Sequence, residues 1–218
     1  MRISHCHRFV FFSNPKTGSS TVRQFLDPYS DVVPAPNYRE KTEDNPFYPH
    51  MRPAEARHLF RRFGWDFEGY AKFVFVRNPW ARLVSLFEHI RRATGKPLEF
   101  SDWVYTIKPY GSGGGGEAWE LWRRYGAYSV EHFIKDEAGN VLVDKVLRLE
   151  DIDASLVPYL RALGLPVAAN MAIGHKNRHD VGRRYRDYYS DDSAAHVADL
   201  YRYDIVHYGY TFSGEFLD

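Results

Sequence analysis

The sequence has 218 residues, a formal net charge of +1 at pH 7, 44% hydrophobic residues and 17% aromatic residues. This apolar content excludes a disordered chain, and the length suits a single domain over residues 1–218 with a substantial core. The near-neutral charge argues against a protein that coats nucleic acid, so we expect no nucleic-acid partner.

The cysteine and histidine content predicts neither disulfides nor a metal site. Cys6 is the single cysteine, which predicts a cytoplasmic location by default. The apolar run at the start is too short for a signal peptide, and no later run is long enough to cross a bilayer. Neither the His5–Cys6–His7 stretch nor the pair His175 and His179 has a partner pair at metal-site spacing, so we expect no metal.

The first pattern along the chain is a strand, a polar turn and a helix over residues 8–26 (RFVFFSNPKTGSSTVRQFL). Val22, Phe25 and Leu26 share one side of the expected helix. Such a turn gathers unpaired backbone N–H groups and the positive end of a helix dipole around Lys16, which favours a phosphate ligand. An ordinary strand-to-helix loop of small residues is the alternative reading at this point.

A proline-rich segment over residues 27–49 follows and shows no sustained period. Long irregular loops in compact domains tend to be lids or binding loops, which is our expectation here. His50 closes this segment. A helix is then predicted to begin at Pro53, because proline suits the first helical turn, and to end at Gly64.

A second strand, turn and helix follow over residues 72–90. The run KFVFV is typical of a strand buried on both faces in a parallel sheet, and Asn78 and Pro79 suit a helix start. Arg77 at the strand end and Ser85 in the second helical turn could hold a phosphate through a guanidinium and a hydroxyl. A structural ion pair and a packing serine are the alternative. Together with the first loop, the pair indicates a ligand with two separated phosphates.

The rest of the chain continues the alternation of strands and helices. Gly111 to Gly116 predict a flexible loop near a binding surface, because no strand precedes them and no lysine follows. The other expected elements are a short helix over 98–107 capped by Ser101, a hairpin over 133–143, a strand over 145–149, a helix over 152–163, and a long helix capped by Ser190 and ended by Gly209. This order predicts an α/β fold with a largely parallel sheet whose ligand site lies at the carboxyl ends of the strands.

The first loop is not a Walker A sequence. Lys16 precedes Gly18, whereas a Walker A lysine follows its second glycine, and the strand over 72–76 ends in arginine rather than a Walker B aspartate. Both departures weaken an ATPase or kinase assignment.

The two loops resemble motifs of sulfotransferases. PKTGSST after a strand resembles their 5′-phosphosulfate loop, and residues 75–85 (FVRNPWARLVS) resemble their 3′-phosphate motif, with arginine and serine at the family's spacing. Weaker similarities to the carbohydrate-type branch lie in an H-x-x-x-A-E stretch over 50–55 and in residues 148–151, 175–189 and 203–212. The resemblance implies a three-layer, P-loop-like α/β fold with a central, mainly parallel sheet flanked by helices.

The resemblance also implies a reaction and its residues. The donor would be 3′-phosphoadenosine 5′-phosphosulfate (PAPS), and the sulfuryl group would pass in line to an acceptor hydroxyl without a metal. Lys16 would act at the bridging oxygen of the leaving group. The residues implied to bind the donor are Lys16, Thr17, Gly18, Ser19, Ser20 and Thr21 at the 5′ end, and Arg77 and Ser85 at the 3′-phosphate.

The sequence leaves several candidates for the acceptor and for the general base. A carbohydrate hydroxyl is favoured, and a phenol or a lipid-like alcohol stays open. His50 is the first candidate for the base, because a neutral imidazole titrates near neutral pH, and Glu150 and Glu117 are the alternatives. Two other functions also stay open at this stage: a P-loop-type nucleotide or small-molecule kinase that uses ATP and magnesium, and a non-catalytic nucleotide-binding protein.

Overall fold

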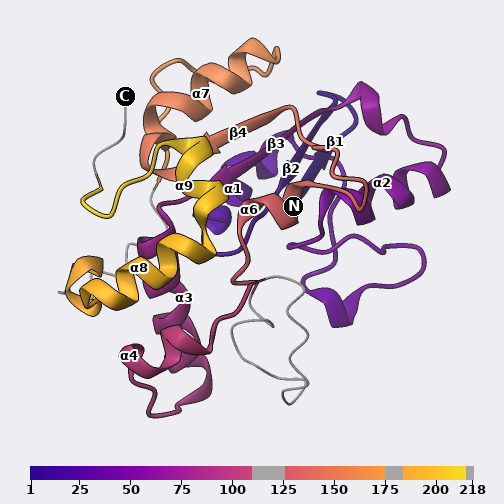
Figure 1. The fold of residues 1–218 in the computed structure, drawn as a ribbon. Coiled ribbons are helices and arrows are strands. Elements are labelled where there is room, and N and C mark those ends of the chain that lie inside the picture. The colour runs from indigo at the N-terminus through magenta and orange to yellow at the C-terminus, as the bar shows by residue number, and fades with distance from the viewer. Residues whose placement is uncertain (110–125, 175–183, 215–218) are drawn as a thin grey trace. The chain divides into compact units, whose positions relative to one another are not determined.

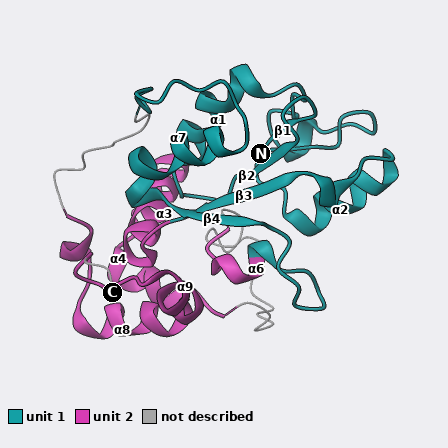
Figure 2. Cartoon of the chain, turned by 90° about the horizontal axis from the view of Figure 1, so that it is seen from above, with its two compact units in different colours: residues 1–76, 133–178 teal, residues 77–132, 179–218 magenta. Residues whose placement is uncertain are grey.

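A computed structural model of the chain describes residues 1–109, 126–174 and 184–214 (Figure 1). The Gly111–Gly116 loop, Glu117 and the pair His175 and His179 therefore lie outside the described residues. The chain divides into two compact units (Figure 2), one built from residues 1–76 and 133–178 and the other from residues 77–132 and 179–218. Each unit is described by itself below, and the single domain expected over residues 1–218 stays a prediction.

The first unit contains a four-stranded sheet in the order β1 (Arg2–Ser4), β2 (Phe9–Phe12), β3 (Ala71–Val76) and β4 (Lys145–Arg148). Strands β2, β3 and β4 run parallel, and β1 pairs antiparallel with β2. The predicted α/β fold with a mainly parallel sheet flanked by helices is thus confirmed. The short edge strand β1 was not predicted, because three residues are too few to show a period.

Helices cover both faces of this sheet. α1 (Ser19–Leu26) and α7 (Ile152–Ala162) pack on one face, on the same side of the strands in Figure 2. α2 (Pro53–Arg62) belongs to the other face, where the Phe60 ring lies 5.3 Å from Phe67, itself 6.4 Å from Phe12. The main core cluster includes Phe9, Phe11, Val22, Phe25, Leu26, Phe73, Phe75, Leu147, Leu156 and Leu160.

The register of the parallel strands brings their carboxyl ends to one edge of the sheet. Phe12 pairs with Val74, and Val76 pairs with Arg148. The polar loop that follows Phe12 therefore begins at the edge where ligands bind in open parallel sheets, as the sequence predicted.

The second unit is helical among its described residues. It contains α3 (Pro79–Thr94), α4 (Phe100–Trp103), α8 (Asp191–Leu200) and α9 (Arg202–Tyr208). The short helix α6 (Val130–Ile134) begins in this unit and ends in the other. The Trp80 indole N–H donates to the Ala194 carbonyl at 2.9 Å, which ties α3 to α8.

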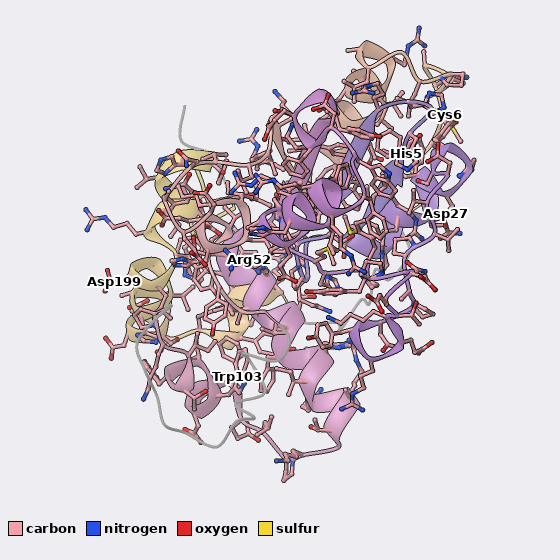
Figure 3. All side chains as sticks on the ribbon, turned by 90° about the vertical axis from the view of Figure 1, so that its right-hand side faces the viewer. His5, Cys6, Asp27, Arg52, Trp103 and Asp199 are labelled. Carbon is pink, nitrogen blue, oxygen red and sulfur yellow. The ribbon has the colours of Figure 1, made fainter. Side chains whose placement is uncertain are left out.

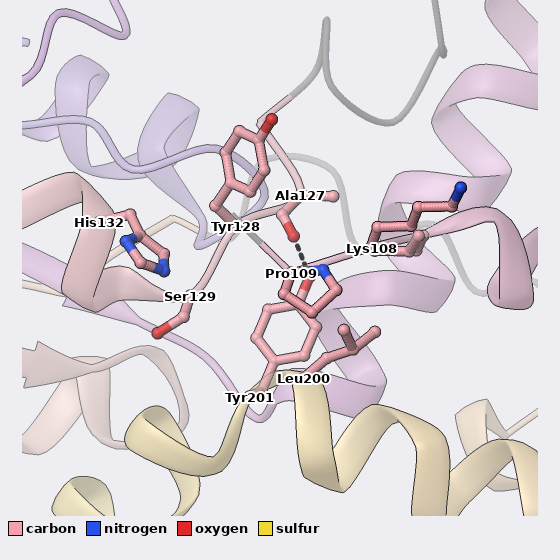
Figure 4. Close-up of a pocket in the computed structure, with 9 residues that line it drawn as sticks. Lys108, Pro109, Ala127, Tyr128, Ser129, His132, Leu200 and Tyr201 are labelled. Carbon is pink, nitrogen blue, oxygen red and sulfur yellow. Dashed lines mark hydrogen bonds between the residues drawn. The ribbon is translucent and has the colours of Figure 1, made fainter. Parts of the chain in front are cut away.

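A buried polar cluster holds the segment before α6. Arg82 donates to the carbonyls of Gly126 at 2.9 Å and Tyr128 at 2.6 Å, and Asp204 accepts from the Ser129 hydroxyl. Burial raises the pKa of Asp204 to about 6. Figure 4 shows the small pocket beside this cluster, where the Tyr201 hydroxyl donates to the Ala127 carbonyl.

Two local predictions in this part of the chain are wrong. Ser101 does not cap a helix, because α4 begins at Phe100 after Glu99. Phe133 and Ile134 are helical in α6 rather than part of a hairpin strand, and the expected hairpin is reduced to an antiparallel bridge between Lys135 and Val141. Phe100, Trp103, Phe133 and Ile134 are all buried, so tertiary packing accompanies both differences.

The long C-terminal helix is in fact two helices, α8 and α9, which meet at Tyr201. Tyr201 is buried, and its hydroxyl is bonded to the Ala127 carbonyl, so a tertiary contact accompanies the break. The predicted caps are confirmed at both ends: the Ser190 hydroxyl accepts from the Ser193 N–H at 3.2 Å, and Gly209 ends α9 with φ +67°.

Candidate active site

The loop between β2 and α1 has an unusual backbone. Lys16 and Gly18 both adopt left-handed conformations, with φ of +64° and +71°. For lysine this conformation costs about 1–2 kcal/mol, and such strain concentrates at functional sites. The φ of Gly18 favours glycine, and a Cβ there would displace the end of the Leu149 side chain in η5 (Leu149–Asp151).

The hydroxyl groups of the loop differ in their exposure. Thr17 is fully buried and donates to the Asn14 carbonyl at 2.9 Å, so its side chain stabilises the turn itself. Ser19 and Thr21 are buried, whereas Ser20 is half-exposed. Of the predicted donor-binding side chains in this loop, Lys16 and Ser20 are therefore the ones that keep substantial contact with solvent.

The start of α1 offers backbone donors. Its N-cap residue is Gly18, and no side chain makes a capping hydrogen bond. The Thr21 N–H donates to the Gly18 carbonyl at 3.0 Å. Within the part of the chain that the structure describes, the N–H groups of Ser19 and Ser20 meet no acceptor. These two donors and the positive end of α1 suit an anionic ligand.

His50 lies against the beginning of this loop. Its Nδ1 is 2.7 Å from the Ser13 carbonyl oxygen. A carbonyl can only accept, so Nδ1 carries the proton and Nε2 keeps a free lone pair in the neutral ring. Ser13 immediately follows β2, and this bond therefore connects the predicted base to the predicted phosphate loop.

The surroundings of His50 favour the neutral form. Loss of hydration around the ring lowers the pKa of His50 below its ordinary value of 6.5, and the positive charges of Arg23 and Lys16 act in the same direction. The residue as a whole keeps solvent-exposed surface. A neutral imidazole at neutral pH is the form that a general base requires.

The alternative bases are Glu150 and Glu117. Glu150 is exposed in η5, next to Leu149, which contacts Gly18. Arg148, at the end of β4, forms an ion pair with Asp151 at 2.6 Å. Glu117 lies outside the described residues. The hydrogen bond between His50 and Ser13 therefore supports His50 as the first candidate.

The second motif lies at the junction of β3 and α3. The Asn78 side chain accepts from the Ala81 N–H at 3.2 Å and donates to the Thr211 carbonyl at 2.9 Å, which confirms the predicted cap. Arg77 and Ser85 are both half-buried, and Ser85 lies in the second turn of α3. Both belong to the second unit, whereas Lys16 and His50 belong to the first, so a shared ligand stays a prediction.

Figure 3 shows side chains of the first unit, including His5 and Cys6 in the turn after β1. Cys6 is exposed, and its backbone N–H donates to Asp31 at 2.8 Å. Among the described residues, no three histidine, cysteine, aspartate or glutamate side chains gather as a metal site would require. The described helices also include none with the length and apolar character needed to cross a membrane.

The fold and the loop define an α/β protein with a strand–loop–helix at the carboxyl edge of its parallel strands, where backbone donors suit an anion. A family model described as "Sulfotransferase family" matches residues 1–114, which is more than half of the chain. The chain therefore belongs to the sulfotransferase family, whose general reaction is the transfer of a sulfuryl group, and it is by class a transferase.

The chain is also similar to a solved structure. The crystal structure of a sulfotransferase from Alicyclobacillus acidocaldarius is 14% identical to this chain, with a TM-score of 0.46 over 89% of this chain and 95% of that one. The search of curated proteins found no match.

Proposed function

We propose that this protein transfers the sulfuryl group of PAPS to an acceptor hydroxyl, and that the acceptor is a carbohydrate. The proposal is carried by three features that occur together in the first unit. Lys16 has a left-handed backbone conformation, the start of α1 has no side-chain cap, and the His50 ring is hydrogen-bonded to the Ser13 carbonyl. Sulfotransferases generally use PAPS as the donor, and this loop has the donors that a phosphosulfate group needs.

His50 acts as the base in the proposed reaction. Its Nε2 takes the proton of the acceptor hydroxyl while the acceptor oxygen forms a bond to sulfur. The bond between sulfur and the bridging oxygen breaks, and its electron pair passes to the 5′-phosphate of adenosine 3′,5′-bisphosphate. Ser13 holds the ring orientation and the tautomer that leave Nε2 free.

Lys16 stabilises the leaving group in this scheme. Negative charge grows on the bridging oxygen as the sulfur–oxygen bond breaks, and a cation placed there lowers the barrier. The N–H groups of Ser19 and Ser20 hold the 5′-phosphate together with the Ser20 hydroxyl, while Thr17 and Gly18 shape the turn. The proposal needs no metal, because positioning and electrostatics suffice for a loose, in-line transfer.

Arg77 and Ser85 hold the 3′-phosphate in the proposal. A guanidinium can bind a phosphate in a bidentate manner, and a hydroxyl adds one further hydrogen bond. Support comes from their sequence spacing and from their place at the start of α3, where the Asn78 side chain accepts from the Ala81 N–H.

The nature of the nucleotide tests the proposal most directly. Isothermal titration calorimetry should show tight binding of adenosine 3′,5′-bisphosphate without magnesium and much weaker binding of ATP with magnesium. The reverse order would indicate a kinase. Binding of the bisphosphate without transfer to any acceptor would indicate a non-catalytic protein.

The acceptor class needs a separate screen with labelled donor. Sugars, phenols and lipid-like alcohols should be offered in parallel, and we expect turnover with a sugar hydroxyl. Support for a sugar is limited to the resemblance of residues 50–55 and of the C-terminal stretches to carbohydrate-type enzymes, so labelling of a phenol alone would overturn this part. The cytoplasmic location likewise stays a prediction from the single cysteine.

A further inference from the structure

The side chain of Arg23 lies against the start of α1. Arg23 is in the second turn of this helix, and helical side chains point back toward the N-terminus. Its Nε donates to the Ser19 carbonyl at 3.3 Å, and its Nη2 donates to the Ser20 hydroxyl at 3.4 Å. The guanidinium therefore lies beside the two residues whose backbone N–H groups meet no acceptor in the described chain.

The charge of Arg23 is not matched by a carboxylate at contact distance. Among the described residues, no acidic side chain forms an ion pair with it, and the nearby Asp27 pairs with Arg2 instead. Both hydrogen bonds of Arg23 go to neutral oxygens and are long. A half-buried cation with weak neutral partners is costly unless an anion joins it.

The surroundings of Arg23 hold more positive than negative charge. Burial lowers the pKa of the Arg23 guanidinium, and the positive charge of Arg2 lowers it further, while Asp27 opposes them. The positive charges of Arg23 and Lys16 both lower the pKa of His50, so both cations lie within electrostatic reach of the predicted base. Such an excess of cations at the positive end of a helix favours an oxyanion.

We infer that Arg23 binds an oxyanion at the start of α1, as a second cation of the site beside Lys16. The inference rests on the proposed function for the identity of that oxyanion. It is a phosphate oxygen of the donor, or an acidic group of the acceptor. In each case Arg23 contributes binding, whereas Lys16 acts on the bond that breaks.

The test compares R23Q with R62Q. Arg62 is exposed on α2 in the same unit and pairs with Glu43 on the surface, so R62Q removes an arginine without touching the loop. Calorimetry with adenosine 3′,5′-bisphosphate should show about tenfold weaker binding for R23Q, because the bound phosphate loses a charge-assisted hydrogen bond. R62Q should stay within about twofold of the original protein, since surface ion pairs contribute little.

The acceptor arm uses methyl glucuronide and methyl glucoside as probes, with the bisphosphate present. If the oxyanion belongs to the acceptor, R23Q should lose affinity for the glucuronide and keep its affinity for the glucoside and the bisphosphate. Restoration of the lost binding in R23A by free guanidinium would support a direct contact, because a packing role gives no such rescue.

The inference is wrong if folded R23Q, with an unchanged thermal midpoint, binds the bisphosphate and both sugars as the original protein does. An original protein that binds no bisphosphate would instead contradict the proposed function. Inorganic sulfate then serves as the probe: sulfate binding that weakens in R23Q would still support an oxyanion at Arg23, and equal sulfate binding in R23Q would overturn it.

Discussion

The two strand–turn–helix segments of this chain begin their helices in opposite ways. α1 starts after a left-handed Gly18 and has no side-chain cap. α3 starts with Pro79, which has no N–H, and its N-terminus is capped by Asn78 through Ala81. The first helix thus leaves the N–H groups of Ser19 and Ser20 for a ligand, whereas at the second helix a side chain accepts from the Ala81 N–H.

Because of this difference, we expect the two segments to have different roles although their local folds are similar. An anion at α1 can be bound by backbone N–H groups, which cannot be removed by substitution, so its side chains are available for catalysis and charge. An anion at α3 depends on side chains such as Arg77 and Ser85. We therefore expect substitutions in the first segment to affect turnover most, and those in the second to affect nucleotide affinity.

Lys16→Ala should show the largest effect, because the developing charge on the leaving group would lose its cation. We expect turnover to fall by about 10³-fold, near the upper end for loss of one transition-state donor. The affinity for adenosine 3′,5′-bisphosphate should fall much less, since the backbone donors remain. Turnover equal to that of the original protein would show that the first segment does not determine turnover.

His50→Gln should reduce turnover by about 10²-fold, because proton removal by a positioned base contributes about that much. Glutamine keeps a polar group near Ser13, so the thermal midpoint serves as the control for folding. Normal acceptor turnover in this variant would move the base to another residue, with Glu150 as the next to test.

The pH dependence provides a second test of His50. Its pKa is lowered, so the ring binds its proton only below 6.5 in the folded protein, and kcat/KM should be flat from about pH 6.5 to 8 with an acidic limb below. The unfolded chain binds more protons than the folded one in the window between the lowered pKa and 6.5. Stability should therefore rise with pH through that window, and H50Q should lose this part of the slope.

Gly18→Ala tests the backbone of the first segment, with Gly64→Ala as the matched control. Both positions have positive φ, +71° and +70°, but a Cβ at Gly64 meets no atom within 4 Å, whereas at Gly18 it collides with Leu149. We expect G64A to cost about 1 kcal/mol from φ alone and G18A about 1–3 kcal/mol more. Equal free energies of unfolding in urea would show that Leu149 moves freely.

Much of this fold was predictable, because long apolar runs and caps act locally. β2, β3, α3 and the helix ends at Gly64 and Gly209 follow from such patterns, and each is present. The break at Tyr201 and the helical α6 depend on contacts with residues distant in sequence, which no local period encodes. The same holds for the site: the loop was visible in the sequence, while the contact of Arg23 with Ser20 needed the helix geometry.

Arg77→Ala and Ser85→Ala should show the smallest effects and complete the comparison. Arg77 can make bidentate, charge-assisted bonds, so its loss should weaken binding of the bisphosphate by about tenfold or more, whereas loss of the Ser85 hydroxyl should cost about three- to tenfold. Turnover at saturating donor should stay near that of the original protein in both variants, because neither residue is proposed to act on the breaking bond. The control ligand is adenosine 5′-phosphosulfate, which lacks the 3′-phosphate: both variants should bind it as the original protein does. A matching loss with this ligand would mean that Arg77 and Ser85 stabilise the start of α3 instead of holding a phosphate.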